Sequence, residues 1–329
     1  MVKDSFEAIT TTTDINALLM PFIRAFSNNK QNPNSIILLF KAFQNNIIHT
    51  NKDDFEDNHQ SICKFFLLAF NTSYEDWDIM IQFQDAIISA FCTFLTQLNE
   101  SLLTDNLNKF TEFFEKIMDH NQEDYITNRL FFVRTENAIL QGLQKSISKF
   151  YGSILPIILP FLNETNDSLF NERQLTIECL QLIQIMAQYA DDDFFDADRF
   201  NSVLNAIIIH ANKVVTNVDE YIKLIILSIA PAFTALMDTT KDEMLWRSAN
   251  LQLIEMMKND DSRIKIGAMK IVDEEFKVIG GELTGLLPEL VPYLAECAEY
   301  AKGDVDVIAR ETIQSIENSI GEPINTYFT

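Results

Sequence analysis

Histidine is the residue type in this sequence whose clustering would most directly indicate catalysis or metal binding. The four histidines are far apart, and none has a partner at metal-ligand spacing: His49, His59, His120 and His210. His49 and His59 lie near a polar stretch, so we expect both of them to be solvated at the surface. The histidines therefore predict no metal site.

Carboxylates are densest in the run Asp191–Asp193, which Asp196 and Asp198 follow. A calcium loop of the EF-hand type needs oxygen ligands at fixed positions and a glycine at its sharp turn. Phe195 occupies a ligand position and no glycine makes the turn. We therefore predict a turn between two helices, with aspartates as helix caps, and not a calcium site.

The motifs of nucleophilic and nucleotide chemistry do not occur. The sequence has no GxSxG, no GxxxxGK[ST] and no GxGxxG. Acidic residues are frequent, but none falls in a predicted apolar pocket that would raise its pKa. The four cysteines form no CxxC pair and lie in apolar stripes, which predicts buried free thiols in a reducing compartment: Cys63, Cys92, Cys179 and Cys297. We predict that the chain is not an enzyme and holds no cofactor or metal.

The composition is that of a folded helical protein. Of the 329 residues, 47% are hydrophobic and 22% are charged, and only 8 are glycine and 8 proline. This low glycine and proline content disfavours turn-dense β architectures. The formal net charge is −23, and the acidic excess is larger after residue 150. Such a surface repels phosphate backbones, so we expect contact with nucleic acid to be indirect.

Nothing in the sequence suggests a membrane partner. The N-terminal residues lack the apolar core of a signal peptide. The richest apolar run, at 153–162, is far too short to span a bilayer and contains two prolines. We therefore expect a soluble intracellular protein.

Apolar residues recur every three or four positions along almost the whole chain, which predicts helices separated by short polar breaks. We expect a dozen or more helices, each of roughly 12 to 20 residues. The predicted details include a helix capped by Asp14, one opened by Pro33, a polar separator at 50–58, a helix capped by Thr104 or Asp105, one near 135–150, and one interrupted by Pro231.

An internal echo indicates a repeat. The stretch YGSILPIILPFLNETND at 151–167 matches TGLLPELVPYLAECAEYAKGD at 284–304 in placing Leu-Pro before an apolar stripe with Pro-aromatic-Leu. Helices with such stripes need a neighbour on both sides. We predict an all-α fold, an α-solenoid of HEAT-like helical hairpins of about 40 residues each. Residues 1–127 would form degenerate repeats and 128–329 HEAT-like repeats, continuous with the first part.

The last hairpin resembles HEAT repeats in particular. It reads LLPELVPYLAE, then Gly-Asp, then DVIARETIQSIE. The resemblance implies that Pro288 belongs to the first helix of the repeat. It further implies that Asp304 or Asp306 caps the second helix and offers a carboxylate to Arg310.

A more specific resemblance covers 263–328 and, upstream of it, 128–162. These segments resemble the C-terminal region of the U3 small nucleolar RNA-associated protein 10 / HEAT repeat-containing protein 1 family, most particularly in the closing IGEPINTY. We see no resemblance before residue 128. Members of that family are much longer, so the resemblance implies a C-terminal piece.

The resemblance implies a non-enzymatic scaffold of the UtpA subcomplex in the small-subunit processome, located in the nucleus and nucleolus. Its role would be in ribosome biogenesis, namely assembly of the processome and processing of 18S pre-rRNA. This role would extend to transcription by RNA polymerase I. Its partners would be other UtpA and processome proteins, with pre-rRNA and U3 small nucleolar RNA contacted only indirectly. The alternative is a HEAT-repeat scaffold of another complex, of the transport receptor or phosphatase scaffold type. A third possibility is a helical enzyme.

The end of the chain follows the last predicted helix. An array of stacked helices must cover its terminal apolar face. We predict that Tyr327 and Phe328 fold back as this cover, in preference to anchoring a partner.

Overall fold

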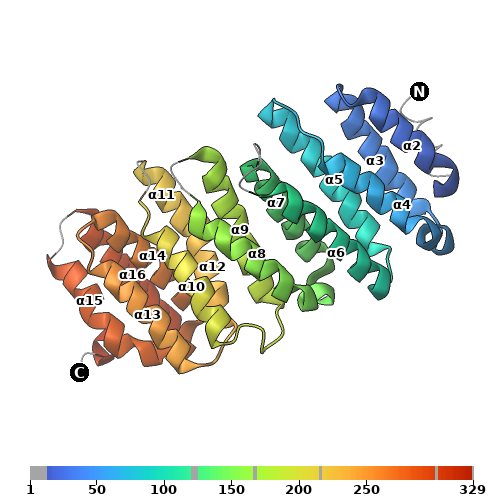
Figure 1. Ribbon diagram of the computed structural model, residues 1–329. Coiled ribbons are helices and arrows are strands. Elements are labelled where there is room, and N and C mark those ends of the chain that lie inside the picture. Colours follow the sequence, from blue (N-terminus) through green and yellow to red (C-terminus); the bar gives the residue numbers. More distant parts are fainter. Residues whose placement is uncertain (1–12, 120–124, 166–168, 215–216, 301–302, 328–329) are drawn as a thin grey trace. The chain divides into compact units, whose positions relative to one another are not determined.

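The computed structural model describes residues 13–119, 125–165, 169–214, 217–300 and 303–327, and each regular element within these ranges is helical (Figure 1). The chain divides into two compact units, Met1–Leu143 and Gln144–Thr329. The prediction of an all-α fold is confirmed. The separation of degenerate repeats before residue 128 from HEAT-like repeats after it stays a prediction.

The first unit is built from helical hairpins. Its described α-helices are α2 (Ile15–Asn29), α3 (Pro33–His49), α4 (Lys52–Phe70), α5 (Trp77–Thr96), α6 (Glu100–Ile117) and α7 (Tyr125–Leu143). Helices α2, α4 and α6 pack in one layer, and α3, α5 and α7 pack in the other. Each successive pair therefore stacks on the pair before it.

Asparagine and aspartate caps set where these helices begin. Asp14 caps α2 and Pro33 opens α3, as predicted. The predicted separator at 50–58 is wrong, because Asn51 accepts a hydrogen bond from the Asp54 amide and α4 begins directly after it.

Two further boundaries were also predicted wrongly. Asn99 caps α6 through the Leu102 amide, so the helix starts before the predicted caps Thr104 and Asp105. Helix α7 starts at Tyr125, well before residue 135. The first turns of α4 and α6 contain exposed polar residues, so they resemble loops in the sequence.

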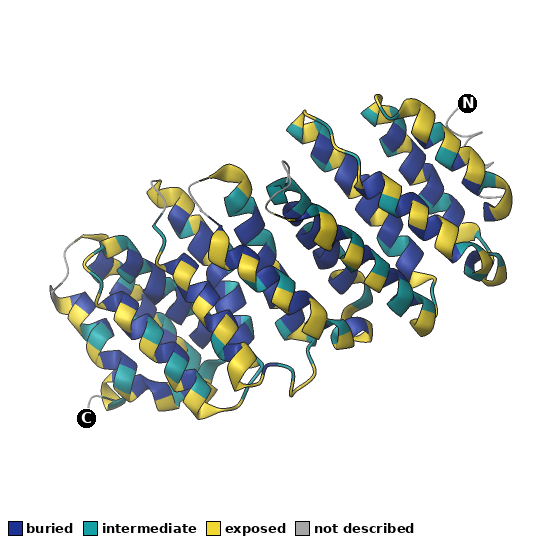
Figure 2. Ribbon diagram, in the orientation of Figure 1, coloured by how far each residue is buried: buried dark blue, intermediate teal, exposed yellow. Residues whose placement is uncertain are grey.

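Aromatic side chains hold the hairpins of the first unit together. The Phe70 ring lies 5.1 to 5.4 Å, between centroids, from four other buried phenylalanines: Phe91, Phe110, Phe114 and Phe131. Figure 2 shows the buried residues on the helix sides that face the neighbouring layer. These phenylalanines are thus core residues, as predicted, and their edge-to-face contacts join one hairpin to the next.

The second unit repeats the two-layer arrangement. Its elements are η1 (Gln144–Phe150), α8 (Tyr151–Glu164), α9 (Phe170–Tyr189), α10 (Ala197–Ala211), α11 (Val218–Leu224), η2 (Ile225–Ile229), α12 (Ala230–Asp238), α13 (Glu243–Met257), α14 (Ser262–Val278), η3 (Gly280–Leu286), α15 (Leu287–Tyr300), α16 (Asp304–Ile320) and η4 (Ile324–Tyr327). The first-helix layer consists of α8, α10, α13 and α15, and the second-helix layer of α9, α12, α14 and α16. Their alternation gives four stacked hairpins.

The internal echo marks equivalent positions of this repeat. Both echoing segments form helices of the first-helix layer, α8 and α15. Pro156 and Pro160 lie inside α8 and Pro292 lies inside α15, all three on exposed faces. A proline there leaves a freed carbonyl to water instead of burying it.

The helix that contains Pro231 is continuous, so the predicted interruption is wrong. Helices α11 and α12 are joined without a break by η2, a π-helical turn. Proline lacks an N–H and its ring clashes with the carbonyl four residues earlier, and a π turn relieves that clash. The helix therefore continues through the proline.

Two helical stretches are long and apolar enough to cross a membrane by length and composition alone. They are Trp77–Thr96, with a mean hydropathy of 1.4, and Val218–Asp238, with 1.5. In each, 56% of the apolar window is buried inside the helix stack. Core helices pass the same test, so this finding is weak evidence for a membrane span.

Ile324 in η4 covers the end of the last hairpin. Its side chain is buried where η4 packs on α15 and α16. Tyr327 is half-buried, and its hydroxyl donates to a Glu322 carboxylate oxygen. Phe328, the other predicted cover, lies outside the described residues.

Candidate functional site

The predicted repeat signature lies at the last hairpin, but its capping role is wrong. Pro288 is an exposed residue in the first turn of α15. The N-cap of α16 is Gly303, with φ 83°, and no side chain makes the capping hydrogen bond. Asp304 and Asp306 stand in the first helical turn, where a carboxylate is stabilised by the helix dipole.

Arg310 has another partner than the predicted aspartate. Its guanidinium Nη2 donates to the Ala298 carbonyl oxygen at 2.7 Å, near the C-terminal end of α15. Among the described ion pairs, none joins Arg310 to Asp304 or Asp306. The arginine therefore ties α16 to α15 by satisfying a carbonyl in the last turns of α15.

We expect Arg310→Ala to lower the free energy of unfolding by about 1 kcal/mol, because a charged donor to this carbonyl is lost. The measurement is urea unfolding followed by circular dichroism. Arg247→Ala is the matched control. Its guanidinium Nε is 3.9 Å from Glu289 and half-exposed, so its loss should change stability by only a few tenths of a kcal/mol. Equal effects of the two substitutions would contradict the role of Arg310.

The histidines are structural or exposed. His49 is exposed, as predicted, but His59 is buried, with its Nδ1 3.3 Å from the Asn106 amide nitrogen. The expectation that His59 is solvated is therefore wrong, because the polar stretch around it is the exposed face of α4. His210 is also buried, with Nε2 2.7 Å from the Leu162 carbonyl oxygen. His120 lies outside the described residues.

The aspartate run is a capped turn, as predicted. Asp196 caps α10 by accepting from the Arg199 amide at 2.9 Å. Asp191 accepts from the Ser148 hydroxyl at 2.9 Å. Within the described ranges, no three histidine, cysteine or acidic side chains lie close enough together to hold a metal ion.

All four cysteines are free thiols. Cys63, Cys179 and Cys297 are buried, as predicted, whereas Cys92 is partly exposed. Burial raises the pKa of Cys63 to about 11 and that of Cys92 to about 12. Both thiols therefore stay protonated near neutral pH and are poor nucleophiles.

Two glutamates contradict the expectation that no carboxylate lies in apolar surroundings. Glu136 on α7 and Glu275 on α14 are buried, and desolvation raises the pKa of each to about 8. Neither carboxylate oxygen of Glu275 has a hydrogen-bond partner. Neither residue lines the cavity described next. Glu275 falls on a helical stripe whose other members are apolar or glycine, whereas the buried residues of α7 around Glu136 include Arg129, Thr135 and Asn137.

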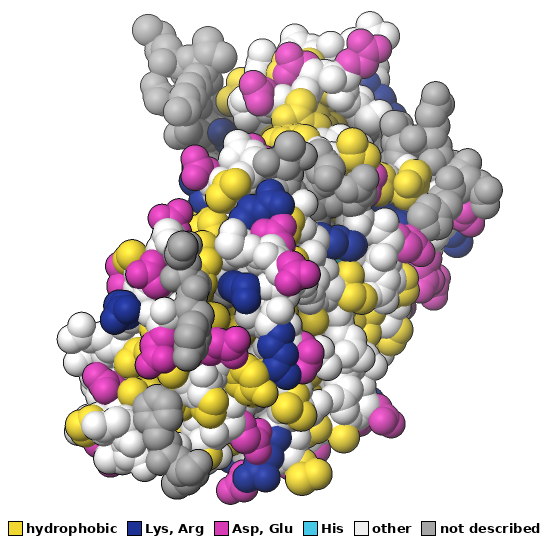
Figure 3. All heavy atoms as spheres, turned by 90° about the vertical axis from the view of Figure 1, so that its left-hand side faces the viewer, with side chains coloured by type: hydrophobic (Ala, Val, Ile, Leu, Met, Phe, Trp, Pro, Cys, Tyr) yellow, Lys and Arg dark blue, Asp and Glu magenta, His cyan; other side chains and the backbone are white. Residues whose placement is uncertain are grey.

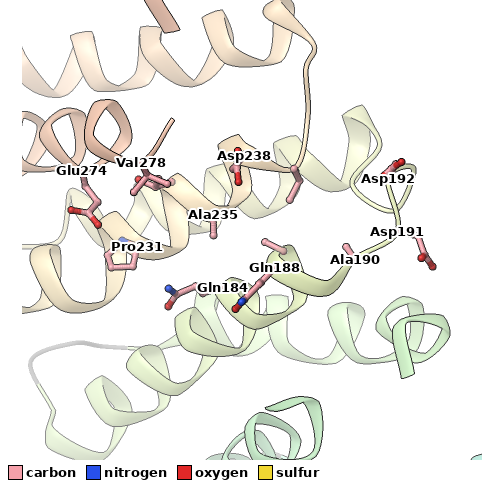
Figure 4. Close-up of a pocket in the computed structure, with 13 residues that line it drawn as sticks. Gln184, Gln188, Ala190, Asp191, Asp192, Pro231, Ala235, Asp238, Glu274 and Val278 are labelled. Carbon is pink, nitrogen blue, oxygen red and sulfur yellow. The ribbon is translucent and has the colours of Figure 1, made fainter. Parts of the chain in front are cut away.

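The candidate binding site is a cavity of about 410 Å³ in the second-helix layer of the second unit. It lies between α9, α12 and α14, beside the turn that follows α9 (Figure 4). We call it the acidic pocket, since four acidic and two amide residues line it: Asp191, Asp192, Asp238, Glu274, Gln184 and Gln188.

Helical spacing brings these side chains together. Gln184 and Gln188 are four residues apart and so share one face of α9. In Figure 4 they extend into the space next to Pro231 and Ala235 of α12. Glu274 enters from α14. A helix within the second-helix layer packs along its two sides against the adjacent helices of that layer. The face between these two sides is free to line a cavity.

The charge of the acidic pocket is only partly compensated. No lysine or arginine lines it. Lys145 lies 3.8 Å from an Asp191 carboxylate oxygen, but both side chains are largely exposed. Lys241 pairs with Glu282 at 2.5 Å, and that hydrogen bond raises its pKa more than the charge of Asp238 does. A cation entering the pocket would therefore be stabilised.

The sequence comparisons identify relatives of this chain. Residues 54–195 match the BP28CT (NUC211) domain. HEAT repeat-containing protein 1 of Homo sapiens is 20% identical over 341 residues, covering 98% of this chain. U3 small nucleolar RNA-associated protein 10 of Candida albicans is 23% identical over 214 residues, covering 62%. The chain is a homologue of these proteins. The family resemblance inferred from the sequence is confirmed.

The similarity also extends further than the sequence analysis indicated. The HEAT repeat-containing protein 1 homolog of Dictyostelium discoideum is 27% identical over 141 residues, or 42% of this chain. Because the domain match begins at residue 54, the statement that no resemblance precedes residue 128 is wrong. The matched stretches are 6% of the Dictyostelium protein, 16% of the human protein and 11% of the Candida protein, so the chain spans a small part of their length.

Solved structures show the same fold. A crystal structure of a Kap121p mutant superposes with a TM-score of 0.61 at 15% identity, covering 97% of this chain and 32% of that one. Kap121p bound to RanGTP gives a TM-score of 0.62 at 13% identity, covering 92% and 29%. At this identity the likeness shows the fold alone. The predicted α-solenoid of HEAT-like hairpins is confirmed.

Proposed function

We propose that this chain is a non-enzymatic scaffold segment in ribosome biogenesis. The observation that carries the proposal is the similarity of 98% of the chain to human HEAT repeat-containing protein 1. Further support comes from the relatives named for their association with U3 small nucleolar RNA. The finer role is assembly of the small-subunit processome and 18S pre-rRNA processing, in the nucleus and nucleolus, with an extension to RNA polymerase I transcription.

The architecture supports a role in binding proteins. Stacked hairpins present long rows of helix faces, and each face is available for another protein without any change of fold. Several large apolar side chains lie exposed on these faces, among them Leu227, Met244 and Val307. An interface with another protein would bury such side chains.

The charge supports indirect contact with RNA. Direct binding to RNA depends on lysine and arginine groups that replace the counterions of the phosphates. The net charge of this chain is −23. On the face shown in Figure 3, lysine and arginine side chains are scattered among aspartates and glutamates and form no continuous basic surface. We infer that other UtpA and processome proteins join this chain to pre-rRNA and U3 small nucleolar RNA.

Affinity purification of the tagged chain from its own cells tests the proposal. We expect processome proteins and U3 small nucleolar RNA to be enriched over an untagged control. RNase treatment before capture should remove the RNA and leave the protein partners bound, because the contacts are between proteins. Recovery of transport cargo or of a phosphatase catalytic subunit, without processome proteins, would overturn the proposal. Loss of all partners after RNase treatment would overturn the indirect contact with RNA.

A further inference from the structure

We propose that the acidic pocket is a docking site for a partner protein and receives a lysine or arginine side chain from a basic segment of that partner. The inference rests on the proposed scaffold function in one respect: it assumes that the molecule bound in the pocket is a protein. Its grounds are a buried hydroxyl group, the charge of the walls and the shape of the apolar surface beside them.

The first ground is Thr234, which lines the acidic pocket from α12. Its side chain is 2% exposed, and its hydroxyl oxygen has no hydrogen-bond partner. Other helical threonines of this chain donate to the carbonyl one turn back, as Thr135 does to Phe131 at 2.7 Å. A buried hydroxyl without a partner costs free energy, which a donor on a bound ligand would recover.

The second ground is the charge. Asp238 ends α12 and Glu274 comes from α14, so carboxylates from two helices line one cavity. The nearest lysines of α14 have other carboxylate partners: Lys270 lies 3.8 Å from Glu311, and Lys277 lies 2.7 Å from Asp273. A guanidinium or ammonium group entering the pocket could pair with one of these carboxylates.

The third ground is the apolar surface next to the carboxylates. Pro231 and Ala235 form one wall, and Val278, 59% exposed, forms another. Lysine and arginine bury their methylene stems against such surfaces while their charged ends reach polar groups. A cavity of about 410 Å³ has room for one such side chain and part of its neighbours.

Other occupants fit less well. RNA would bring phosphates toward an acidic lining, which repels them. A bound metal ion needs several ligands converging on one point, and no such group occurs among the described histidine, cysteine and acidic side chains. A basic protein segment satisfies both the charge and the apolar walls.

The test uses a short fluorescein-labelled peptide in which lysine and arginine alternate with leucine. Its binding to the purified chain is measured by fluorescence anisotropy near physiological salt. The same peptide with citrulline and norleucine as uncharged replacements is the ligand control. We expect the charged peptide to bind and the uncharged one to bind at least about tenfold more weakly.

Matched variants locate the site. Asp238→Asn with Glu274→Gln should weaken binding at least about tenfold, and Thr234→Val should weaken it several-fold. Asp57→Asn with Glu299→Gln removes the same number of charges from exposed positions outside the pocket and should leave binding nearly unchanged. Circular dichroism checks that each variant is folded.

Three outcomes would overturn the inference: no binding by the wild-type chain, equal weakening by the pocket and control variants, or competition by an RNA oligomer as strong as by unlabelled peptide. These outcomes are independent of the affinity purification. If processome proteins are recovered but the peptide does not bind, the scaffold function stands and the docking site falls. If the peptide binds but no processome protein is recovered, the docking site stands and the scaffold function in ribosome biogenesis falls.

Discussion

Replacing Glu275 with glutamine is expected to raise the free energy of unfolding by about 3 kcal/mol at pH 7 and to leave it nearly unchanged at pH 4.5. The carboxyl is fully buried, and desolvation raises its pKa from 4.5 to about 8. Each tenfold change in the ionisation equilibrium is worth about 1.4 kcal/mol. The substitution therefore removes a group that the folded chain must keep protonated.

The sign follows from proton linkage. Between pH 4.5 and about 8 the folded chain holds a proton on Glu275 that the unfolded chain has released. The contribution of this carboxyl to stability is thus complete at low pH, falls as the pH rises, and is constant above pH 8. Glutamine cannot ionise, but it keeps the size and polarity of the neutral acid, so the variant lacks this slope.

The measurement is urea unfolding of both proteins over this pH range. Glu136→Gln is the matched variant in the first unit, because the pKa of Glu136 is also raised to about 8 by burial. It should show the same trend for the unfolding of its own unit. Parallel pH profiles for wild type and Glu275→Gln would mean that Glu275 is ionised in the folded chain, and the prediction would be wrong.

Replacing Gly267 with alanine is expected to lower the free energy of unfolding by about 1 to 3 kcal/mol, in spite of the better helix propensity of alanine. A methyl group at this position on α14 would lie 2.6 Å from the Tyr221 hydroxyl oxygen and 3.3 Å from the Ile225 Cδ1 atom. The tyrosine is buried, and its hydroxyl donates to the Ala211 carbonyl at 2.7 Å. The hydroxyl cannot move away without losing that hydrogen bond.

Tyr221→Phe supplies the decisive test of this clash. Alone it should cost about 1 kcal/mol, since the Ala211 carbonyl loses its donor. In the Gly267→Ala background the same change removes the clashing oxygen, and the remaining contacts start at 3.3 Å. The double mutant should therefore be more stable than the sum of the two single effects, by about 1 kcal/mol or more.

Gly152→Ala is the control for helix propensity. Gly152 lies in the first turn of α8, and a methyl group there would meet nothing within 4 Å. We expect a neutral or slightly stabilising effect. Additive effects at Gly267 and Tyr221, measured by thermal and urea unfolding, would contradict the proposed close packing.

Much of the helical architecture could be predicted from the sequence. The spacing of apolar residues located most helices, and Asp14 and Pro33 marked helix starts correctly. The echo between 151–167 and 284–304 predicted two equivalent helices, α8 and α15. These features depend on neighbours within one or two helical turns, which is why a linear pattern contains them.

The predicted helix boundaries were wrong where a capping residue determines the start of the helix. Asn51 and Asn99 start α4 and α6 inside stretches that read as polar loops. At α16 a glycine took the position expected for Asp304 or Asp306, because the turn requires a positive φ. An aspartate and a glycine can both precede a helix, and only the backbone path distinguishes them.

The candidate site could not be predicted from the sequence. Gln184, Thr234 and Glu274 are far apart in the chain and belong to three helices of the second-helix layer. Each is an ordinary polar residue on an amphipathic helix. These helices also carry basic residues, such as the exposed Lys277 on α14, so the local sequence does not mark an acidic site.

The sequence by itself determined the helical class, the repeat and the family resemblance, because these lie in local spacing and in contiguous motifs. The tertiary structure decided which polar groups are buried. It brought Asp238 and Glu274 to one cavity, placed Glu275 in the core beside it and directed Arg310 to the Ala298 carbonyl. A polar side chain becomes buried or finds a distant partner only where separate helices pack together. Its shifted pKa and its effect on stability are therefore set by that packing and not by the local sequence.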